Sequence, residues 1–64
     1  MLKFNVWKVN KDGNPIEGTD KIMTATSLRW LMRHIAYMEG VELRLGSKIV
    51  RLPNGEMWCG QIIS

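Results

Sequence analysis

The amino-acid sequence predicts an α+β fold, in which a small antiparallel sheet of four to five short strands packs against one helix, in the order ββαβββ. Three observations support this prediction. Apolar and polar residues alternate near the N-terminus, apolar residues recur with a helical period in the middle of the chain, and two short turn signals divide the remainder. At 64 residues the chain has room for a single domain, residues 1–64, with a small core.

The first predicted strand is residues 2–9, LKFNVWKV, where side chains alternate between two faces. One face carries Leu2, Phe4 and Val6, and the other carries Lys3, Asn5, Trp7 and Val9. The next segment is rich in turn formers and too long for a two-residue hairpin loop; these residues are Asp12, Gly13, Pro15 and Gly18. We therefore expect a second short strand, residues 21–25, to return beside the first.

The segment SLRWLMRHIAYMEG, residues 27–40, predicts the helix. Its apolar residues fall at helical spacing and form one core-facing stripe of Leu28, Leu31, Met32, Ile35 and Ala36. We expect Thr24 or Thr26 to be the N-cap, because a hydroxyl there can accept a hydrogen bond from an amide of the first turn. Gly40 is the expected end of the helix.

The rest of the chain contains two signals for two-residue hairpin loops, Gly46-Ser47 and Asn54-Gly55. The first loop would pair Leu43 with Val50, Val41 with Leu52, and Glu42 with Arg51. The second would pair Val50 with Cys59, Leu52 with Met57, and Arg51 with Trp58. Both registers place apolar pairs on one face, so we expect Val50 and Cys59 to point inward and Arg51 and Trp58 outward.

Aromatic and basic residues gather on two surfaces that face away from this core. On the helix, the arc opposite the apolar stripe carries Arg29, Trp30, Arg33, His34 and Tyr37. On the outer face of the sheet, the predicted register exposes Trp7, Trp58 and Arg51. Because Trp, Tyr and Arg dominate the energetics of interfaces, the candidate partner-binding residues are Arg29, Trp30, Arg33, Tyr37, Trp7, Trp58 and Arg51.

Each surface also has an explanation that needs no partner. Trp7 and Trp58 can cover each other and the aliphatic stem of Arg51, and the helix arc can be an ordinary solvated face. His34 is interpreted as a lone surface histidine, and Cys59 as a small core residue.

Composition argues against several classes of protein. One cysteine cannot form an intramolecular disulfide, and one cysteine with one histidine cannot complete a structural zinc site. Cys59 and His34 are the only candidate nucleophile and base, and their predicted faces separate them. No phosphate-binding loop is present in the sequence. We therefore expect no enzyme activity, no cofactor and no metal.

The sequence favours a small binding module that docks on another protein and regulates or inhibits it. The alternative is a protein that binds single-stranded nucleic acid by aromatic stacking and phosphate neutralisation, for which a net charge of +3 provides only a weak field. A short chain with a half-apolar outer sheet face also suggests a homodimer that buries Trp7 and Trp58. The absence of a long apolar run leads us to expect a cytoplasmic protein with no membrane association, of bacterial or phage origin by its size.

Overall fold

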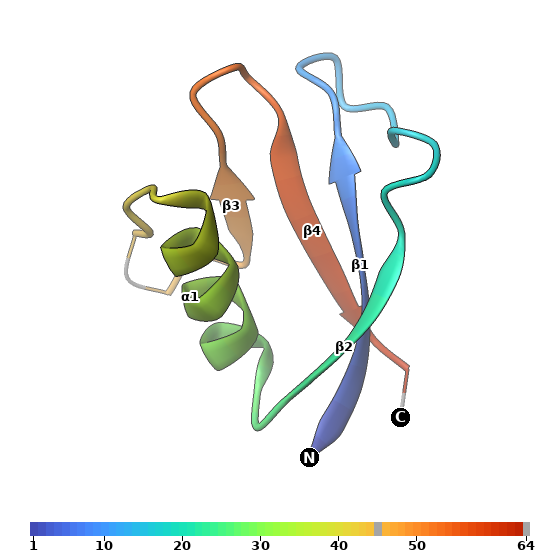
Figure 1. Ribbon diagram of the computed structural model, residues 1–64, viewed down its shortest axis with the longest axis vertical. Helices are drawn as coiled ribbons and strands as arrows, with labels where there is room; N and C mark the ends of the chain where they lie inside the picture. Colours follow the sequence, from blue (N-terminus) through green and yellow to red (C-terminus); the bar gives the residue numbers. More distant parts are fainter. Residues whose placement is uncertain (45, 64) are drawn as a thin grey trace.

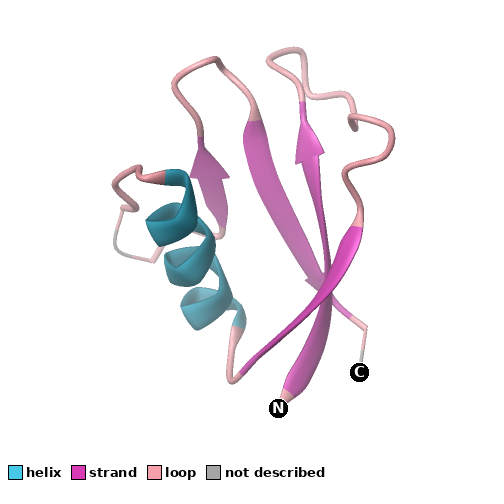
Figure 2. Ribbon diagram, in the orientation of Figure 1, coloured by secondary structure: helices cyan, strands magenta, loops and turns pink. Residues whose placement is uncertain are grey.

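The computed structural model describes residues 1–44 and 46–63 and confirms the α+β fold. Four strands and one helix follow one another as β1 (Leu2–Val9), β2 (Lys21–Ala25), α1 (Leu28–Glu39), β3 (Ile49–Arg51) and β4 (Met57–Ile62). The strands form one antiparallel sheet in the order β2-β1-β4-β3. Figure 1 and Figure 2 show the helix covering one face of this sheet. This face is the inner face of the sheet, and the opposite face is the outer face.

The core lies between α1 and the inner face, as the apolar pattern predicted. Strand β1 contributes Phe4 and Val6, which are almost completely buried. The helix contributes four buried residues at the predicted spacing, Leu31, Met32, Ile35 and Ala36, with Leu28 partly buried beside them. Burial of this stripe is the main force that holds the helix on the sheet.

Strand β2 returns beside β1, as expected, with Leu2 opposite Ala25 and Phe4 opposite Met23. The loop between them stays attached to the far end of β1. The Ile16 amide donates to the Lys8 carbonyl at 2.8 Å, and the Lys8 amide donates to the Thr19 hydroxyl at 3.0 Å. The turn-rich segment is therefore hydrogen-bonded to the edge of β1, even where it forms no named strand.

The N-cap of α1 is Ser27, so the expectation of Thr24 or Thr26 is wrong by one residue or more. The Ser27 hydroxyl accepts a hydrogen bond from the Trp30 amide at 3.2 Å. Thr24 lies within β2 and is not available to the helix. The chemistry is the expected one, since a hydroxyl satisfies an amide of the first turn. Gly40 ends the helix as predicted, in the left-handed conformation.

The predicted first hairpin, with Val41 to Leu43 as its first strand, is not formed. Residues 41–44 contain no strand, and Leu45 lies outside the described residues, so the order is ββαββ. The helix cap explains the difference, because the Val41 amide donates to the Ala36 carbonyl at 3.0 Å and ties this segment to the end of α1. Val41 and Leu43 then pack against the core from the helix side instead of pairing with β3.

The second hairpin forms with its register shifted by one residue. Its closing pair is Leu52 and Glu56, in which the Leu52 amide donates to the Glu56 carbonyl at 2.8 Å. The loop therefore has three residues, Pro53, Asn54 and Gly55. A two-residue loop would make Pro53 a closing residue, and proline has no N–H to donate there. In the three-residue loop Pro53 needs no donor, and Gly55 takes a φ of 91°, as such loops require.

This shift reverses the two faces of β4, and the predicted placements of Trp58 and Cys59 are both wrong. Val50 is opposite Trp58, and Ile49 is opposite Cys59. Trp58 therefore points inward and is only 7% exposed, whereas Cys59 lies on the outer face, partly buried. Val50 and Arg51 keep their predicted faces, since Val50 is fully buried and Arg51 is exposed.

Polar groups surround the buried ring of Trp58 at the edge of the core. Its indole N–H donates to a Glu39 carboxylate oxygen at 3.4 Å, across to the last turn of α1. The ammonium groups of Lys8 and Lys21 lie 5.3 and 5.1 Å from the ring centroid. Lys8 also lies 3.7 Å from a Glu56 carboxylate oxygen. Trp58 therefore joins the helix, β1 and β2 within the fold.

Gly60 allows the helix to approach the sheet closely. It lies opposite Val6 on the inner face. A Cβ atom at this position would lie 3.0 Å from the Met32 Cε atom and 3.2 Å from the Leu28 Cδ1 atom. The absence of a side chain at Gly60 is thus what lets the first half of α1 lie against β4.

Candidate partner-binding site

Four of the predicted site residues form one exposed stripe along α1, which we call the helix stripe: Arg29, Trp30, Arg33 and Tyr37. Trp30 is 56% exposed and Tyr37 is 84% exposed. The guanidinium carbon of Arg33 lies 4.7 Å from the centroid of the Trp30 ring, which is cation–π geometry. The four residues share this surface because positions three, four and seven apart lie on one side of a helix.

The helix stripe contributes little to the stability of the helix itself. Arg29 lies in the first turn, which contains no acidic residue, so its charge opposes the helix dipole. Arg29 and Arg33 are four residues apart, a spacing at which like charges destabilise a helix by a few tenths of a kcal/mol, on the order of 0.2 to 0.5. Trp30 is more than half exposed, and its cation–π contact with Arg33 contributes roughly 0.5 to 1 kcal/mol. Local stability therefore explains Trp30 and Arg33 only in part and does not explain Arg29.

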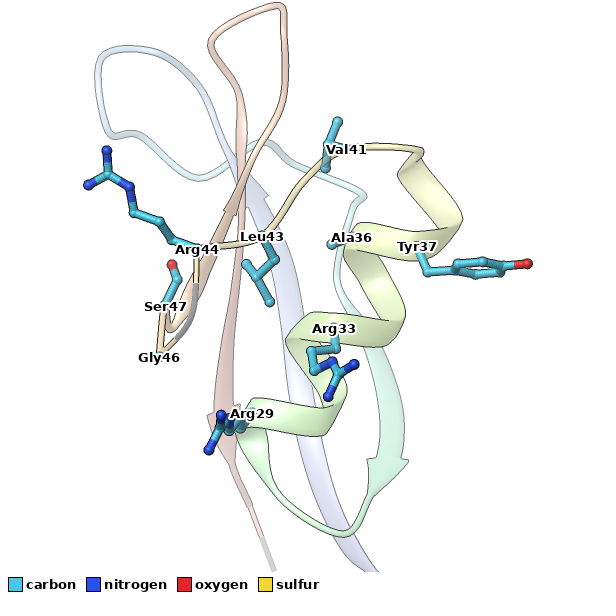
Figure 3. A pocket seen from close by; sticks show the side chains of 9 residues that line it. All are labelled: Arg29, Arg33, Ala36, Tyr37, Val41, Leu43, Arg44, Gly46 and Ser47. Carbon is cyan, nitrogen blue, oxygen red and sulfur yellow. The ribbon is translucent and has the colours of Figure 1, made fainter.

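A groove of about 450 Å³ separates the helix stripe from residues 41–44 and 46–47, which we call the loop (Figure 3). Its apolar lining comes from Ala36, Val41 and Leu43. Arg29 and Arg33 line it from the helix, and Arg44, Gly46 and Ser47 line it from the loop. Figure 3 shows the Tyr37 ring directed away from the loop, so this aromatic ring forms one rim and not the floor.

A second hollow of about 420 Å³ adjoins this groove on the β3 side of the loop. The two share Leu43, Arg44 and Ser47, and the second adds Ile49, Arg51 and Glu42. The loop between them is held by hydrogen bonds, since the Ser47 amide donates to the Arg44 carbonyl at 3.0 Å and the Ser47 hydroxyl donates to the Ile49 carbonyl at 2.8 Å.

The remaining predicted site residues do not join the helix stripe. Trp58 is in the core. Trp7 lies on the outer face of the sheet, half-buried and opposite Cys59, with Ile49 on the other side of Cys59. Arg51 is exposed at the β3 edge, opposite Met57 and not Trp58, and it lines the second hollow. The predicted cluster of Trp7, Trp58 and Arg51 is therefore wrong.

Sequence reasoning missed the loop side of the groove, above all Leu43 and Arg44. The Gly46-Ser47 dipeptide was interpreted as a hairpin loop, which predicted a strand over residues 41–43. The same dipeptide is also consistent with the observed turn, in which the Ser47 amide donates to the Arg44 carbonyl. The nearness of Gly40 was the available signal, because a helix end of this type commonly ties down the residues that follow it.

The structure does not bring Cys59 and His34 together. His34 lies exposed on the helix, and Cys59 lies on the sheet face away from the helix. Burial raises the pKa of the Cys59 thiol, which disfavours the reactive thiolate. In the described part of the chain, no three His, Cys, Asp or Glu residues are placed to hold a metal ion.

No helix within residues 1–44 and 46–63 is long and apolar enough to cross a membrane. Comparison of the chain with protein-family models, with curated proteins and with solved structures gave no match.

Proposed function

We propose that this protein is a non-enzymatic binding module that docks on another protein through the helix stripe and regulates or inhibits that protein. The observation that carries the proposal is the position of Arg29, Trp30 and Arg33. They are exposed on one side of α1, beside a groove with an apolar lining, where the fold gains little from them beyond the contact between Arg33 and the Trp30 ring. The proposal includes a cytoplasmic location and a homodimer.

The residue types support a protein partner. Trp, Tyr and Arg are enriched in interface hot spots, because each combines a large contact area with a polar or charged group. The Trp30 ring with Arg33 packed over it presents such an area. The groove that Arg33 lines gives a partner a concave surface next to this contact, although Trp30 itself does not line the groove.

Single-stranded nucleic acid remains the second candidate, because arginines and an exposed tryptophan lie together on the stripe. The spacing of the aromatic rings is less favourable to it. Trp30 and Tyr37 are seven residues apart, which corresponds to roughly 10 Å along the helix axis. Neighbouring bases stack on more closely spaced rings.

Capture from a bacterial lysate tests the proposal, with nuclease treatment as a second arm. The variant is Trp30→Ala, and its matched control is Ile22→Ala, since Ile22 is 58% exposed and lies on β2, away from the stripe. We expect the wild-type protein and Ile22→Ala to retain the same protein, and Trp30→Ala to lose it by a factor of about thirty or more in affinity.

Nuclease should leave this captured protein unchanged. Capture that disappears with nuclease, together with a log–log salt slope that falls by about 0.7 to 0.9 for Arg29→Ala and for Arg33→Ala, would establish the nucleic-acid candidate instead. Equal capture by the wild-type protein and Trp30→Ala would remove the helix stripe from the binding surface.

A further inference from the structure

We propose that the groove and the second hollow together bind an acidic segment of the partner protein that carries apolar anchor residues. The inference rests on the proposed function and specifies the chemistry of the partner. It follows from three features of these two hollows: their charge, the absence of carboxylates paired with that charge, and their apolar lining.

The charge around the two hollows is strongly one-sided. The charged residues described along their linings are four arginines and one glutamate: Arg29, Arg33, Arg44, Arg51 and Glu42. None of the described residues that line the groove itself is acidic. Since a cleft lined by one sign of charge concentrates the field, the complementary ligand is anionic, although the net charge of the whole chain is only +3.

These guanidinium groups have no carboxylate partner within the described residues. There the one ion pair joins Lys8 to Glu56, near Trp58 on the inner face. Guanidinium groups bind carboxylates through paired, parallel hydrogen bonds, which are among the strongest in proteins. Arg33 already lies over the Trp30 ring in the unbound protein, so less side-chain entropy is lost when a ligand binds it.

The apolar lining indicates a peptide rather than a bare anion. Ala36, Val41 and Leu43 line the groove, and Ile49 adds an apolar surface in the second hollow. Each hollow is within the size range of pockets that accept a small ligand, roughly 300 to 1,000 Å³. Two such hollows on either side of one loop suit a segment of several residues in which Leu-like side chains alternate with carboxylates.

The same surface is poorly suited to bases. Tyr37 is the one aromatic residue that lines the groove, and its ring is directed away from the loop (Figure 3). The second hollow is lined by no aromatic residue. Without a stacking platform in either hollow, phosphate contacts alone would hold a nucleic acid there.

An NMR titration of the ¹⁵N-labelled full chain tests this inference. The probe is a short synthetic peptide with two Glu-Leu-Glu repeats. Its two control peptides replace Glu by Gln, which removes the charge, or Leu by Gly, which removes the anchor. We expect the probe to shift amides of residues 41–44, of residues 46–47 and of the helix stripe. We expect each control peptide to bind at least about tenfold more weakly, which corresponds to about 1.4 kcal/mol.

Matched variants separate specific contacts from general charge. Arg33→Ala and Arg44→Ala each remove one lining arginine, and Lys48→Ala removes the same charge from an exposed residue that lines neither hollow. We expect the first two to weaken peptide binding by about fivefold or more, and Lys48→Ala by less than twofold. Equal weakening by all three, or equal binding of the Gln peptide, would overturn the inference.

The lysate capture distinguishes a failure of this inference from a failure of the proposed function. If Trp30→Ala loses the captured protein while Arg44→Ala and Arg51→Ala both retain it fully, the helix stripe docks the partner and the two hollows do not. If Trp30→Ala retains it, the proposed function itself is wrong. A single-stranded oligonucleotide that shifts the same amides and binds more tightly than the peptide would show that the two hollows bind nucleic acid and not an acidic protein segment.

Discussion

At the scale of the residue, the same amino acid serves different purposes according to where the backbone places it. Trp58 is 7% exposed, donates to Glu39 and packs beside two ammonium groups. Trp30 is 56% exposed and contacts an arginine of its own helix. Trp7 lies half-buried on the opposite face of the sheet. The type of a residue alone therefore does not identify a binding surface. The strand register or helix position, which decides whether the side chain is exposed, is also needed.

This difference predicts the stability of two tryptophan variants. Trp58→Ala removes a buried ring and should lower the free energy of unfolding by about 3 to 5 kcal/mol. Trp30→Ala removes an exposed ring and should lower it by about 1 kcal/mol or less. Urea titration followed by circular dichroism measures both. A loss for Trp30→Ala as large as that for Trp58→Ala would place Trp30 in the core and contradict the site.

A second residue pair tests the faces of β3. Val50 is fully buried and Arg51 is exposed. Val50→Asp would bury an unpaired charge and should cost several kcal/mol, whereas Arg51→Asp should cost about 1 kcal/mol or less. Thermal or urea unfolding of the two variants checks this order, and equal losses would mean that the faces of β3 are reversed.

At the scale of the element, what the sequence could predict depended on how many residues shared each signal. In β1 and α1 the same apolar spacing recurs several times, so an error at one position does not change the predicted face. Phe4, Val6, Leu31 and Ile35 were therefore placed correctly from the sequence. The hairpin between β3 and β4 depended on one dipeptide. Pro53 carried the missing information, because its lack of an N–H excludes it from the closing pair.

The candidate site was predictable to the same extent. The helix stripe followed from the helical period of α1, so Arg29, Trp30, Arg33 and Tyr37 were found together. The loop side of the groove depends on the hydrogen bonds that hold Val41 to the helix end and Ser47 to Arg44 and Ile49. That is a tertiary arrangement with no periodic pattern, and local signals in the sequence do not specify it.

The contact between α1 and β4 predicts the effect of a substitution at Gly60. Gly60→Leu would place a branched side chain where even a Cβ atom lies 3.0 Å from Met32 and 3.2 Å from Leu28. We expect the helix to be displaced and the free energy of unfolding to fall by about 1 to 3 kcal/mol. Gly13→Leu is a control for insertion of the same side chain, because a Cβ there meets nothing within 4 Å, although its positive φ adds a backbone cost.

Calorimetry of the two glycine variants, together with the amide spectrum, checks this prediction. Gly60→Leu should shift the amides of α1 as well as lower the melting temperature. Gly13→Leu should affect only its own loop. An unchanged helix in Gly60→Leu would show that the sheet and helix accommodate the side chain without moving apart.

At the scale of the whole molecule, the two sides of the sheet have different surroundings. The inner face is covered by α1, whereas no helix of residues 1–44 and 46–63 covers the outer face (Figure 1). A row of partly buried apolar residues crosses three strands of the outer face: Trp7, Cys59 and Ile49. A chain this short gains stability when such a surface is buried between subunits. The expected homodimer therefore centres on Trp7 and excludes Trp58.

Sedimentation at micromolar concentration should give about twice the monomer mass, and Trp7→Ala should shift the protein toward the monomer. Cys59 provides an independent measurement, since it pairs with Trp7 in the row. Alkylation with a bulky reagent at alkaline pH, where the thiol of raised pKa ionises, should be slower in the dimer than in diluted protein. A dimer formed through the outer face leaves the helix stripes of both copies exposed on opposite sides. Such a dimer can contact two partner sites at once, and it should therefore bind a partner with repeated sites more tightly than the monomer does. A monomer with Cys59 equally reactive at all concentrations would leave one helix stripe per molecule, and partner binding would then have to rely on that single surface.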